Sequence, residues 1–227
     1  MRLLISSIIL TSLFLLRAHA QEEGDLVLEN VLILKPTQAV VGMKSVEVKT
    51  KMLSDTSRDE RHEYLQEHPV PVVKGPNADL YMIDHHHLSR SLFDSDHRKI
   101  YVQVVRDWSD LSISEFWEKM DKAGFAYLLD TEGKKITYLD LPTSVTDLKD
   151  DPFRSLAYFA RKQGAYDKSS IPFAEFKWAA YYRTHFTSED LEKDWLGTLN
   201  KALDLSFTQD AAKLPGYKGE FSCERIF

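Results

Sequence analysis

The sequence predicts an α+β fold in which a small mixed sheet with helices is followed by a helical, aromatic-rich C-terminal extension. Residues 26–34 and 99–108 form apolar, partly alternating runs, which is the pattern of β-strands. Beyond residue 150, apolar and aromatic side chains recur at helical spacing. No stretch rich in Pro, Gly and Ser separates the two halves, so a single domain is expected.

The first half is expected to alternate strands and helices. The triplet His85-His86-His87 marks the point where a strand passes into a short helix, because Leu88 and Leu92 follow at i, i+4 spacing. The other expected elements are a strand over 26–34, a helix over 41–53, a charged helix over 57–67, strands over 69–73 and 80–84 joined as a hairpin, and a strand over 99–108.

The second half is expected to be mainly helical. Ser112 and Glu115 have the spacing of a capping box and predict a helix over 112–123. A hairpin is expected around Thr131-Glu132-Gly133. We assign structural roles, as helix caps and core aromatics, to Asp150-Asp151 with Arg154 and to Glu175 with Trp178. Three aromatic-rich helical segments are expected over 151–166, 171–186 and 188–205.

The first 20 residues have the pattern of a secretory signal peptide. Arg2 precedes an apolar run over 3–16, and Ala18-His19-Ala20 is a small-residue cleavage site. We therefore expect cleavage after Ala20 and a secreted or periplasmic protein without a transmembrane segment; the alternative is an uncleaved membrane anchor. The predicted organisation is a signal peptide over 1–20, a core over 21–110 and an α-rich C-terminal part over 111–227, packed on the core.

Charge and cysteine content exclude several classes of function. Removal of residues 1–20 leaves 27 Lys and Arg against 35 Asp and Glu, a net charge of −8, which disfavours nucleic acid as a partner. A local basic groove is still compatible with this balance. Cys223 is the single cysteine, so an internal disulfide and thiol-ligated zinc are excluded.

The histidine triplet follows Asp84, and its geometry argues against a metal site. Consecutive residues point about 100° apart on a helix and alternate on a strand, so the three imidazoles do not converge on one ion. Asp84 is instead expected to cap the helix, whose N-terminus favours an anion. Partly protonated His86 and His87, with Arg90 one turn along, would then donate to a phosphate. An ordinary capped helix with exposed histidines is the alternative.

Several segments resemble the ParB-like nuclease family of the ParB/sulfiredoxin superfamily. They are KPTQAVVGMKSVEVK, PVPVV, LYMIDHHHLSRSL, KIYVQVVRDWSDLSISEFWEKM, DDPFRSLAYFARKQGAY and PFAEFKWAAYYR, and they cover residues 30–190. The resemblance implies a nucleotide phosphate bound at the Asp84–Arg90 helix start. The matching turn of the free-serine kinases reads D-G-H-H-R, so His85 replaces a glycine and Leu88 replaces an arginine.

The resemblance also implies roles for individual residues. Asp84, His86 and His87 are the candidate catalytic groups, with a histidine as general acid or base and Asp84 as a candidate Mg²⁺ ligand. The implied phosphate- or ligand-binding residues are His85, Arg90, Gln38 and Lys51.

Three functions follow from these assignments. The first is binding of a nucleotide or phosphorylated small molecule, with phosphodiester cleavage and Mg²⁺ as the candidate cofactor. The second is a nucleotide-dependent small-molecule kinase, which the replacement of the catalytic glutamate by Gln38 disfavours. The third is a non-catalytic module that binds a ligand or a partner.

Overall fold

The computed structural model describes residues 23–219, which form a mixed α+β protein. The predicted signal peptide with its cleavage site and Cys223 lie outside the described residues. Within residues 23–219 no helix is long and apolar enough to cross a membrane. The strands are β1 (Leu26–Asn30), β2 (Leu34–Pro36), β3 (Val40–Val41), β4 (Val70–Lys74), β5 (Leu80–Met82), β6 (Lys99–Asp107) and β7 (Lys149–Asp150).

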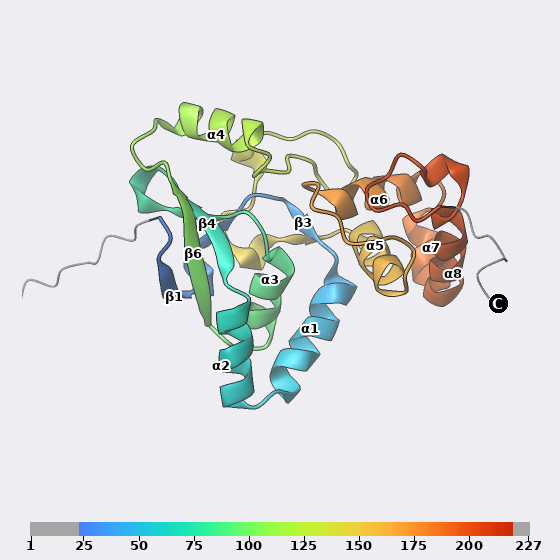
Figure 1. Ribbon diagram of the computed structural model, residues 1–227, viewed down its shortest axis with the longest axis horizontal. Coiled ribbons are helices and arrows are strands. Elements are labelled where there is room, and N and C mark those ends of the chain that lie inside the picture. Colours follow the sequence, from blue (N-terminus) through green and yellow to red (C-terminus); the bar gives the residue numbers. More distant parts are fainter. Residues whose placement is uncertain (1–22, 220–227) are drawn as a thin grey trace, which may run out of the picture.

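Helices surround the sheet on one side of the molecule and gather into a separate group on the other. Figure 1 shows α1, α2 and α3 beside the strands, α4 above them, and α5 to α8 together at the right. The α-helices are α1 (Met43–Asp55), α2 (Arg58–Glu67), α3 (His86–Asp94), α4 (Ile113–Lys122), α5 (Pro152–Lys162), α6 (Ala174–Arg183), α7 (Ser188–Lys193) and α8 (Trp195–Ser206).

The main sheet has five strands in the order β1-β6-β4-β5-β2. β1 is antiparallel to β6, β6 is parallel to β4, β4 is antiparallel to β5, and β5 is parallel to β2. The predicted hairpin between β4 and β5 is confirmed. β3 and β7 pair in parallel as a second, two-stranded sheet, which brings Asp150 close to the start of α1.

The prediction of one strand over 26–34 is wrong. The carboxamide of Asn30 accepts a hydrogen bond from the backbone N–H of Leu32 (3.0 Å) and starts a short 3₁₀ turn at Val31–Ile33. A side chain that bonds its own backbone in this way competes with the sheet ladder. The two pieces therefore separate, and β1 and β2 lie at opposite edges of the sheet.

Two other expectations need correction in the second half. The hairpin around Thr131-Glu132-Gly133 is reduced to a turn with one isolated bridge between Leu129 and Lys135. The helix expected over 188–205 is divided into α7 and α8 at Asp194, whose carboxylate caps α8 by accepting from the N–H of Gly197 (2.9 Å). The predicted capping box at the start of α4 is confirmed.

The buried apolar side chains form three clusters. The first lies between the main sheet and helices α1 and α3. The second is built by α5 to α8 around Trp178, which is fully buried and stacked on Tyr166 at 4.1 Å. The third includes Val40, Tyr81 and Phe116 together with Phe176 of α6. Residues of both halves of the chain therefore share this third cluster.

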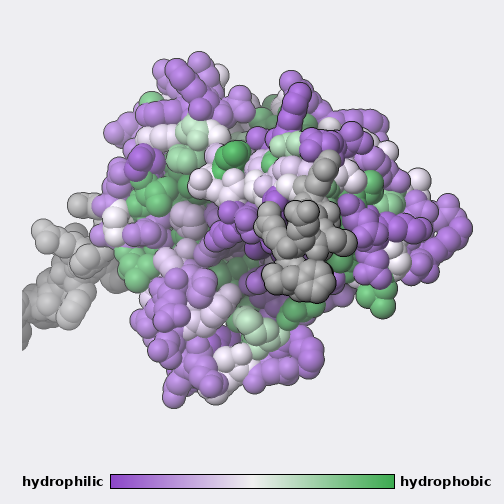
Figure 2. Space-filling model, turned by 45° about the vertical axis from the view of Figure 1, so that its right-hand side comes forward, coloured by the Kyte–Doolittle hydropathy of each residue, from purple (hydrophilic) through white to green (hydrophobic). Residues whose placement is uncertain are grey.

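The surface is mainly polar on the face shown in Figure 2. Where the grey atoms leave this face visible, hydrophobic side chains occur in small, separate groups among hydrophilic ones. This pattern is ordinary for a folded domain, since single exposed apolar residues are common.

Candidate functional site

The turn between β5 and α3 carries the histidine triplet and adopts an unusual backbone conformation. His85 has φ 63° and ψ 24°, in the left-handed region, and is the N-cap of α3. This conformation costs most residues about 1 kcal/mol, which glycine avoids. The expected cap at Asp84 is therefore wrong by one residue. The Asp84 carboxylate is exposed and accepts a hydrogen bond from the N–H of His85 (2.6 Å).

His86 and His87 point into the protein and bind backbone groups. Nε2 of His86 accepts a hydrogen bond from the N–H of Thr37 at the end of β2 (3.1 Å). Nε2 of His87 accepts from the N–H of Gly42, directly before α1 (3.0 Å). The two imidazoles thus join the start of α3 to both ends of the β2–α1 connection. We call these four residues the closed side of the site.

The hydrogen bonds of the closed side define the charge of both imidazoles. A backbone N–H only donates, so Nε2 is unprotonated and the proton of each neutral ring is on Nδ1. Burial lowers the pKa of both His86 and His87 to about 3, and the nearby charge of Arg154 acts in the same direction. Both rings are therefore neutral near pH 7. The expectation of partly protonated phosphate donors is wrong, because neither ring carries the charge and neither has a free Nε2.

A cation from the C-terminal half lies close to the closed side. Arg154 of α5 is only 5% exposed, and its guanidinium carbon lies 3.8 Å from the ring centre of Phe176. Its Nη1 is 3.5 Å from a carboxylate oxygen of Glu175, and its Nε has no partner among the described residues. A buried guanidinium thus lies near the helix start, where Leu88 occupies the position of the arginine of the free-serine kinases.

The acidic pair before α5 has the structural role that the sequence suggested. Asp150 accepts a hydrogen bond from the N–H of Met43 and satisfies the first turn of α1 (2.8 Å). Asp151 caps α5 by accepting from the N–H of Phe153 (3.0 Å) and pairs with Arg183 (2.6 Å). These two carboxylates connect α1, α5 and α6 next to the closed side.

His85 differs from its two neighbours because its ring faces a partly open surface. Its Nδ1 lies 3.3 Å from the carbonyl oxygen of His68 at the end of α2. A carbonyl only accepts, so the neutral ring carries its proton on Nδ1, and Nε2 keeps a lone pair without a partner among the described residues. Burial lowers the pKa of His85, although Asp84 acts in the opposite direction. His85 is therefore a neutral base beside a carboxylate.

Lys49 of α1 is the cation of this open surface, and the sequence did not single it out. Its ammonium donates to the hydroxyl of Tyr64 (3.3 Å), and no carboxylate among the described residues pairs with it. Its charge lowers the pKa of both His85 and His87, so it lies near both rings. We call Asp84, His85 and Lys49 the open side of the site.

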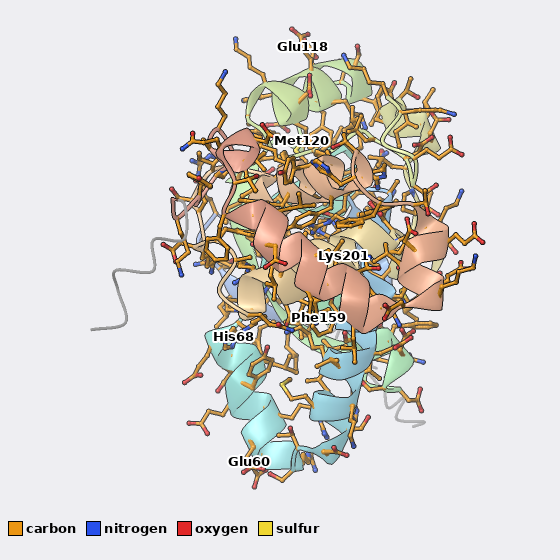
Figure 3. All side chains as sticks on the ribbon, turned by 90° about the vertical axis from the view of Figure 1, so that its right-hand side faces the viewer. Glu60, His68, Glu118, Met120, Phe159 and Lys201 are labelled. Carbon is orange, nitrogen blue, oxygen red and sulfur yellow. The ribbon has the colours of Figure 1, made fainter. Side chains whose placement is uncertain are left out.

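The position of the open side can be followed in Figure 3. His68 is labelled at the end of α2 that meets the rest of the protein, whereas Glu60 is labelled at the far end of the same helix. His85 therefore contacts α2 at its inner end, next to Tyr64, whose ring stacks on that of His68 at 4.2 Å.

Two of the expected ligand-binding residues are placed elsewhere. The side chain of Lys51 is 78% exposed and pairs with Asp55 one turn along α1 (2.8 Å), so it does not reach the turn. Arg90 pairs with Asp94 (2.9 Å) and donates to the carbonyl oxygens of Thr146 and Leu148 at 3.0 and 3.1 Å. Arg90 therefore holds the 145–148 segment against α3.

Gln38 lies next to the closed side but its amide is already engaged. The residue is 6% exposed, and its Nε2 donates to the carbonyl oxygen of Val40 (2.7 Å). The backbone N–H of its neighbour Thr37 donates to Nε2 of His86. Gln38 thus shapes the loop between β2 and β3, and its amide supplies no group that accepts a proton near neutral pH.

No group of three or more metal-ligating side chains occurs among residues 23–219. Mg²⁺ differs from zinc here, because it binds through one or two carboxylates and takes its remaining ligands from water and substrate phosphates. The exposed carboxylate of Asp84 fits that requirement.

Comparison with known proteins agrees with the fold. A family model described as "Putative ParB-like nuclease" matches residues 29–184. The crystal structure of protein Atu1540 from Agrobacterium tumefaciens is similar, with 37% sequence identity and a TM-score of 0.82, over 88% of this chain and 99% of that chain. A search of curated proteins found no match.

The fold and these matches define a ParB-like α+β protein. The chain belongs to the ParB-like nuclease family, whose model covers every residue of the closed and open sides and also Arg154. The family resemblance seen in the sequence is thereby confirmed.

Proposed function

We propose that the protein is an exported phosphodiester-cleaving enzyme whose substrate phosphate binds at the open side. The observation that carries this proposal is the state of His85, a neutral ring with its proton on Nδ1 and a free Nε2 lone pair. A general base needs this state, at a position that solvent and substrate reach. The family description supports the class of reaction.

Each residue of the open side has a role in the proposed reaction. Nε2 of His85 takes a proton from the attacking water as the water oxygen bonds to phosphorus. The phosphorus–oxygen bond to the leaving alcohol then breaks, and the leaving oxygen takes a proton from solvent. The ammonium of Lys49 stabilises the negative charge that develops on the phosphoryl oxygens. Mg²⁺, when bound by Asp84, would supply further positive charge there.

The kinase alternative has less support. In the free-serine kinases that the sequence resembles, the catalytic carboxylate lies where this chain has Gln38. That side chain is buried and donates to the carbonyl oxygen of Val40, so it offers neither a base nor a free group.

Turnover by the chain from residue 21 onwards tests the proposal. Bis(p-nitrophenyl) phosphate and a single-stranded oligonucleotide are incubated with the protein, with and without Mg²⁺. His85→Asn should lower kcat about 100-fold, the usual contribution of a general base. Asparagine tolerates the left-handed backbone, so the fold is kept. His185→Asn, at an exposed position after α6, is the matched control and should leave kcat unchanged.

A second pair of variants tests the cation. Lys49→Gln should lower kcat/KM at least about tenfold, as expected when one charged contact to phosphate is lost. Lys51→Gln removes the same charge two residues along the same helix and should have no effect. Full turnover by His85→Asn would contradict the proposal. Saturable phosphate binding without turnover in the unaltered protein would leave a binding module in place of an enzyme.

A further inference from the structure

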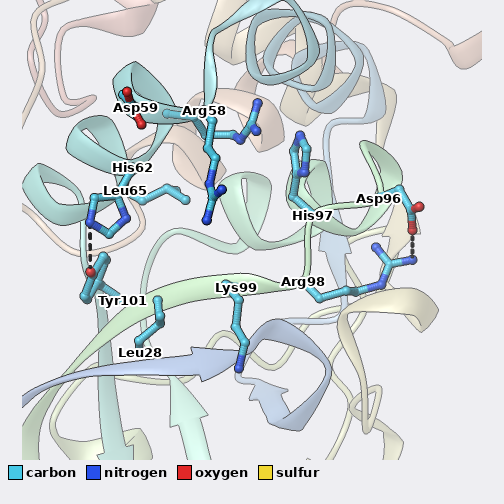
Figure 4. A pocket seen from close by; sticks show the side chains of 11 residues that line it. Leu28, Arg58, Asp59, His62, Leu65, Asp96, His97, Arg98, Lys99 and Tyr101 are labelled. Carbon is cyan, nitrogen blue, oxygen red and sulfur yellow. Dashed lines mark hydrogen bonds and ion pairs between the residues drawn. The ribbon is translucent and has the colours of Figure 1, made fainter.

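A basic cavity lies at the first turns of α2, whereas the histidine turn contacts the other end of that helix. It has a volume of about 590 Å³ and is formed by the first turns of α2 and the start of β6 (Figure 4). Four permanent cations line it against two carboxylates, whereas the whole chain has a net charge of −6. Positive charge is thus concentrated in a hollow of an acidic protein. The cations are Arg58, Arg61, Arg98 and Lys99.

Two of the four cations build the wall of the cavity. Nη1 of Arg61 donates to the carbonyl oxygens of Leu53 and Thr56, both at 2.9 Å, and so ties α2 to the end of α1. Arg98 pairs with Asp96 (2.8 Å) and also donates to a backbone carbonyl. These contacts fix the positions of both guanidinium groups.

The other two cations have no partner among the described residues. In Figure 4 the guanidinium of Arg58 extends over the cavity between the rings of His62 and His97. Lys99 lies on the exposed face of β6 that it shares with Tyr101, and in Figure 4 its ammonium points away from Arg58, toward β1. Arg58 is therefore the unpaired cation that extends over the cavity, and a guanidinium can donate two hydrogen bonds to one phosphate group.

The imidazole rings of His62 and His97 beside Arg58 add polar groups to the cavity but no negative charge. Nε2 of His62 lies 3.4 Å from the hydroxyl of Tyr101, and the two rings meet edge to face at 5.6 Å. His97 has a pKa below its ordinary value because of partial burial and the nearby charges of Arg61 and Arg98. A neutral imidazole at this position still offers a hydrogen-bond donor.

We propose that this cavity is a second binding site, which takes a phosphate monoester of about mononucleotide size. Its volume falls in the range of small-molecule sites, and arginine matches the geometry of phosphate oxygens. The phosphate comes from a free nucleotide or from the 5′ end of an oligonucleotide, because both present the same dianionic group. The site does not depend on the open side, which uses a different set of residues.

Titration of the unaltered protein and two double variants tests the site. The ligands are AMP and a short dT oligonucleotide with a 5′-phosphate or a 5′-hydroxyl, and calorimetry gives Kd. Arg58→Gln/Lys99→Gln should raise the Kd of AMP at least about tenfold. Lys122→Gln/Lys201→Gln removes two exposed charges from α4 and α8 and should leave it unchanged. Backbone NMR signals of Arg58 to His62 should shift on binding.

Each outcome decides the question. Binding of AMP, or of the 5′-phosphorylated oligonucleotide alone, supports the site and identifies its source of phosphate. Equal affinity for the 5′-hydroxyl oligonucleotide, equal Kd in the Arg58→Gln/Lys99→Gln protein, or NMR shifts confined to Asp84 and His85 would overturn it. Absence of saturable binding at millimolar ligand would also overturn it. Failure of turnover at the open side would leave these binding results unaffected.

Discussion

The closed and open sides of the site place identical side chains in opposite conditions. His86 and His87 accept hydrogen bonds from Thr37 and Gly42 and have pKa values lowered to about 3, and His86 is buried whereas His87 is partly buried. His85 donates from Nδ1 to a carbonyl oxygen and keeps Nε2 free. On the closed side the imidazoles connect separate backbone segments, whereas on the open side the imidazole is a candidate base.

The difference arises from backbone geometry rather than from residue type. Because His85 is in the left-handed conformation, its side chain leaves the start of the helix toward α2, whereas the next two side chains point toward α1 and β2. The free-serine kinase turn, which has glycine at this position, would leave that direction empty. The role of each of the three histidines therefore depends on the group to which its ring is hydrogen-bonded.

The largest expected contrast is in stability. His86→Ala leaves the N–H of Thr37 buried without an acceptor and opens a cavity, so the free energy of unfolding should fall by about 3 kcal/mol. His85→Asn removes a partly buried ring whose Nε2 has no partner among the described residues, and should change it by less than about 0.5 kcal/mol. Urea denaturation at pH 7 measures both values. Equal losses would remove the distinction between the two sides.

Gly42 offers the next test of the closed side. A Cβ at this position would lie 2.5 Å from the backbone nitrogen and 2.8 Å from the Cα of Ser155. Gly42→Ala must therefore shift backbone, and we expect a loss of about 2 kcal/mol in urea denaturation. Ser155→Ala in the same chain should not rescue the loss, because the nearest atom belongs to the backbone. A rescue would show that the side chain sets the packing.

The pH dependence of stability gives an effect with a defined sign. The folded pKa of His87 is about 3, below the ordinary value of 6.5, so the unfolded chain binds more protons between these values. Its contribution is complete above about pH 6.5 and is lost as the pH falls toward 3, by roughly 1.4 kcal/mol per pH unit.

Comparison with a variant that does not titrate isolates the contribution of His87 to the pH dependence of stability. Glutamine can still accept from Gly42 but does not titrate, so His87→Gln should give a shallower fall in the free energy of unfolding between pH 6 and 4. Urea denaturation at several pH values for both proteins measures the two slopes. Identical slopes would mean that His87 is not buried in the neutral form.

Local elements of this fold and the location of the histidine turn could be predicted from the sequence, whereas the contacts of the site could not. Spacing and capping residues indicated α4, and alternation indicated β6, because both signals lie within a few residues. The partners of the triplet are distant instead, since Thr37 lies 49 residues from His86. Lys49 and Arg154 reach the turn through helix packing, which no local pattern records. Arg90 and Lys51 had suitable charges but face other segments.

An NMR titration of the imidazole nitrogens of His85, His86 and His87 distinguishes the closed side from the open side most directly. We expect the rings of His86 and His87 to stay neutral and insensitive to phosphate from pH 7 to 5. His85 should protonate first as the pH falls, and its Nε2 signal should shift when phosphate is added. Titration of His86 or His87 near pH 6.5 would contradict their structural role. A phosphate response at those rings with none at His85 would contradict phosphate binding at the open side.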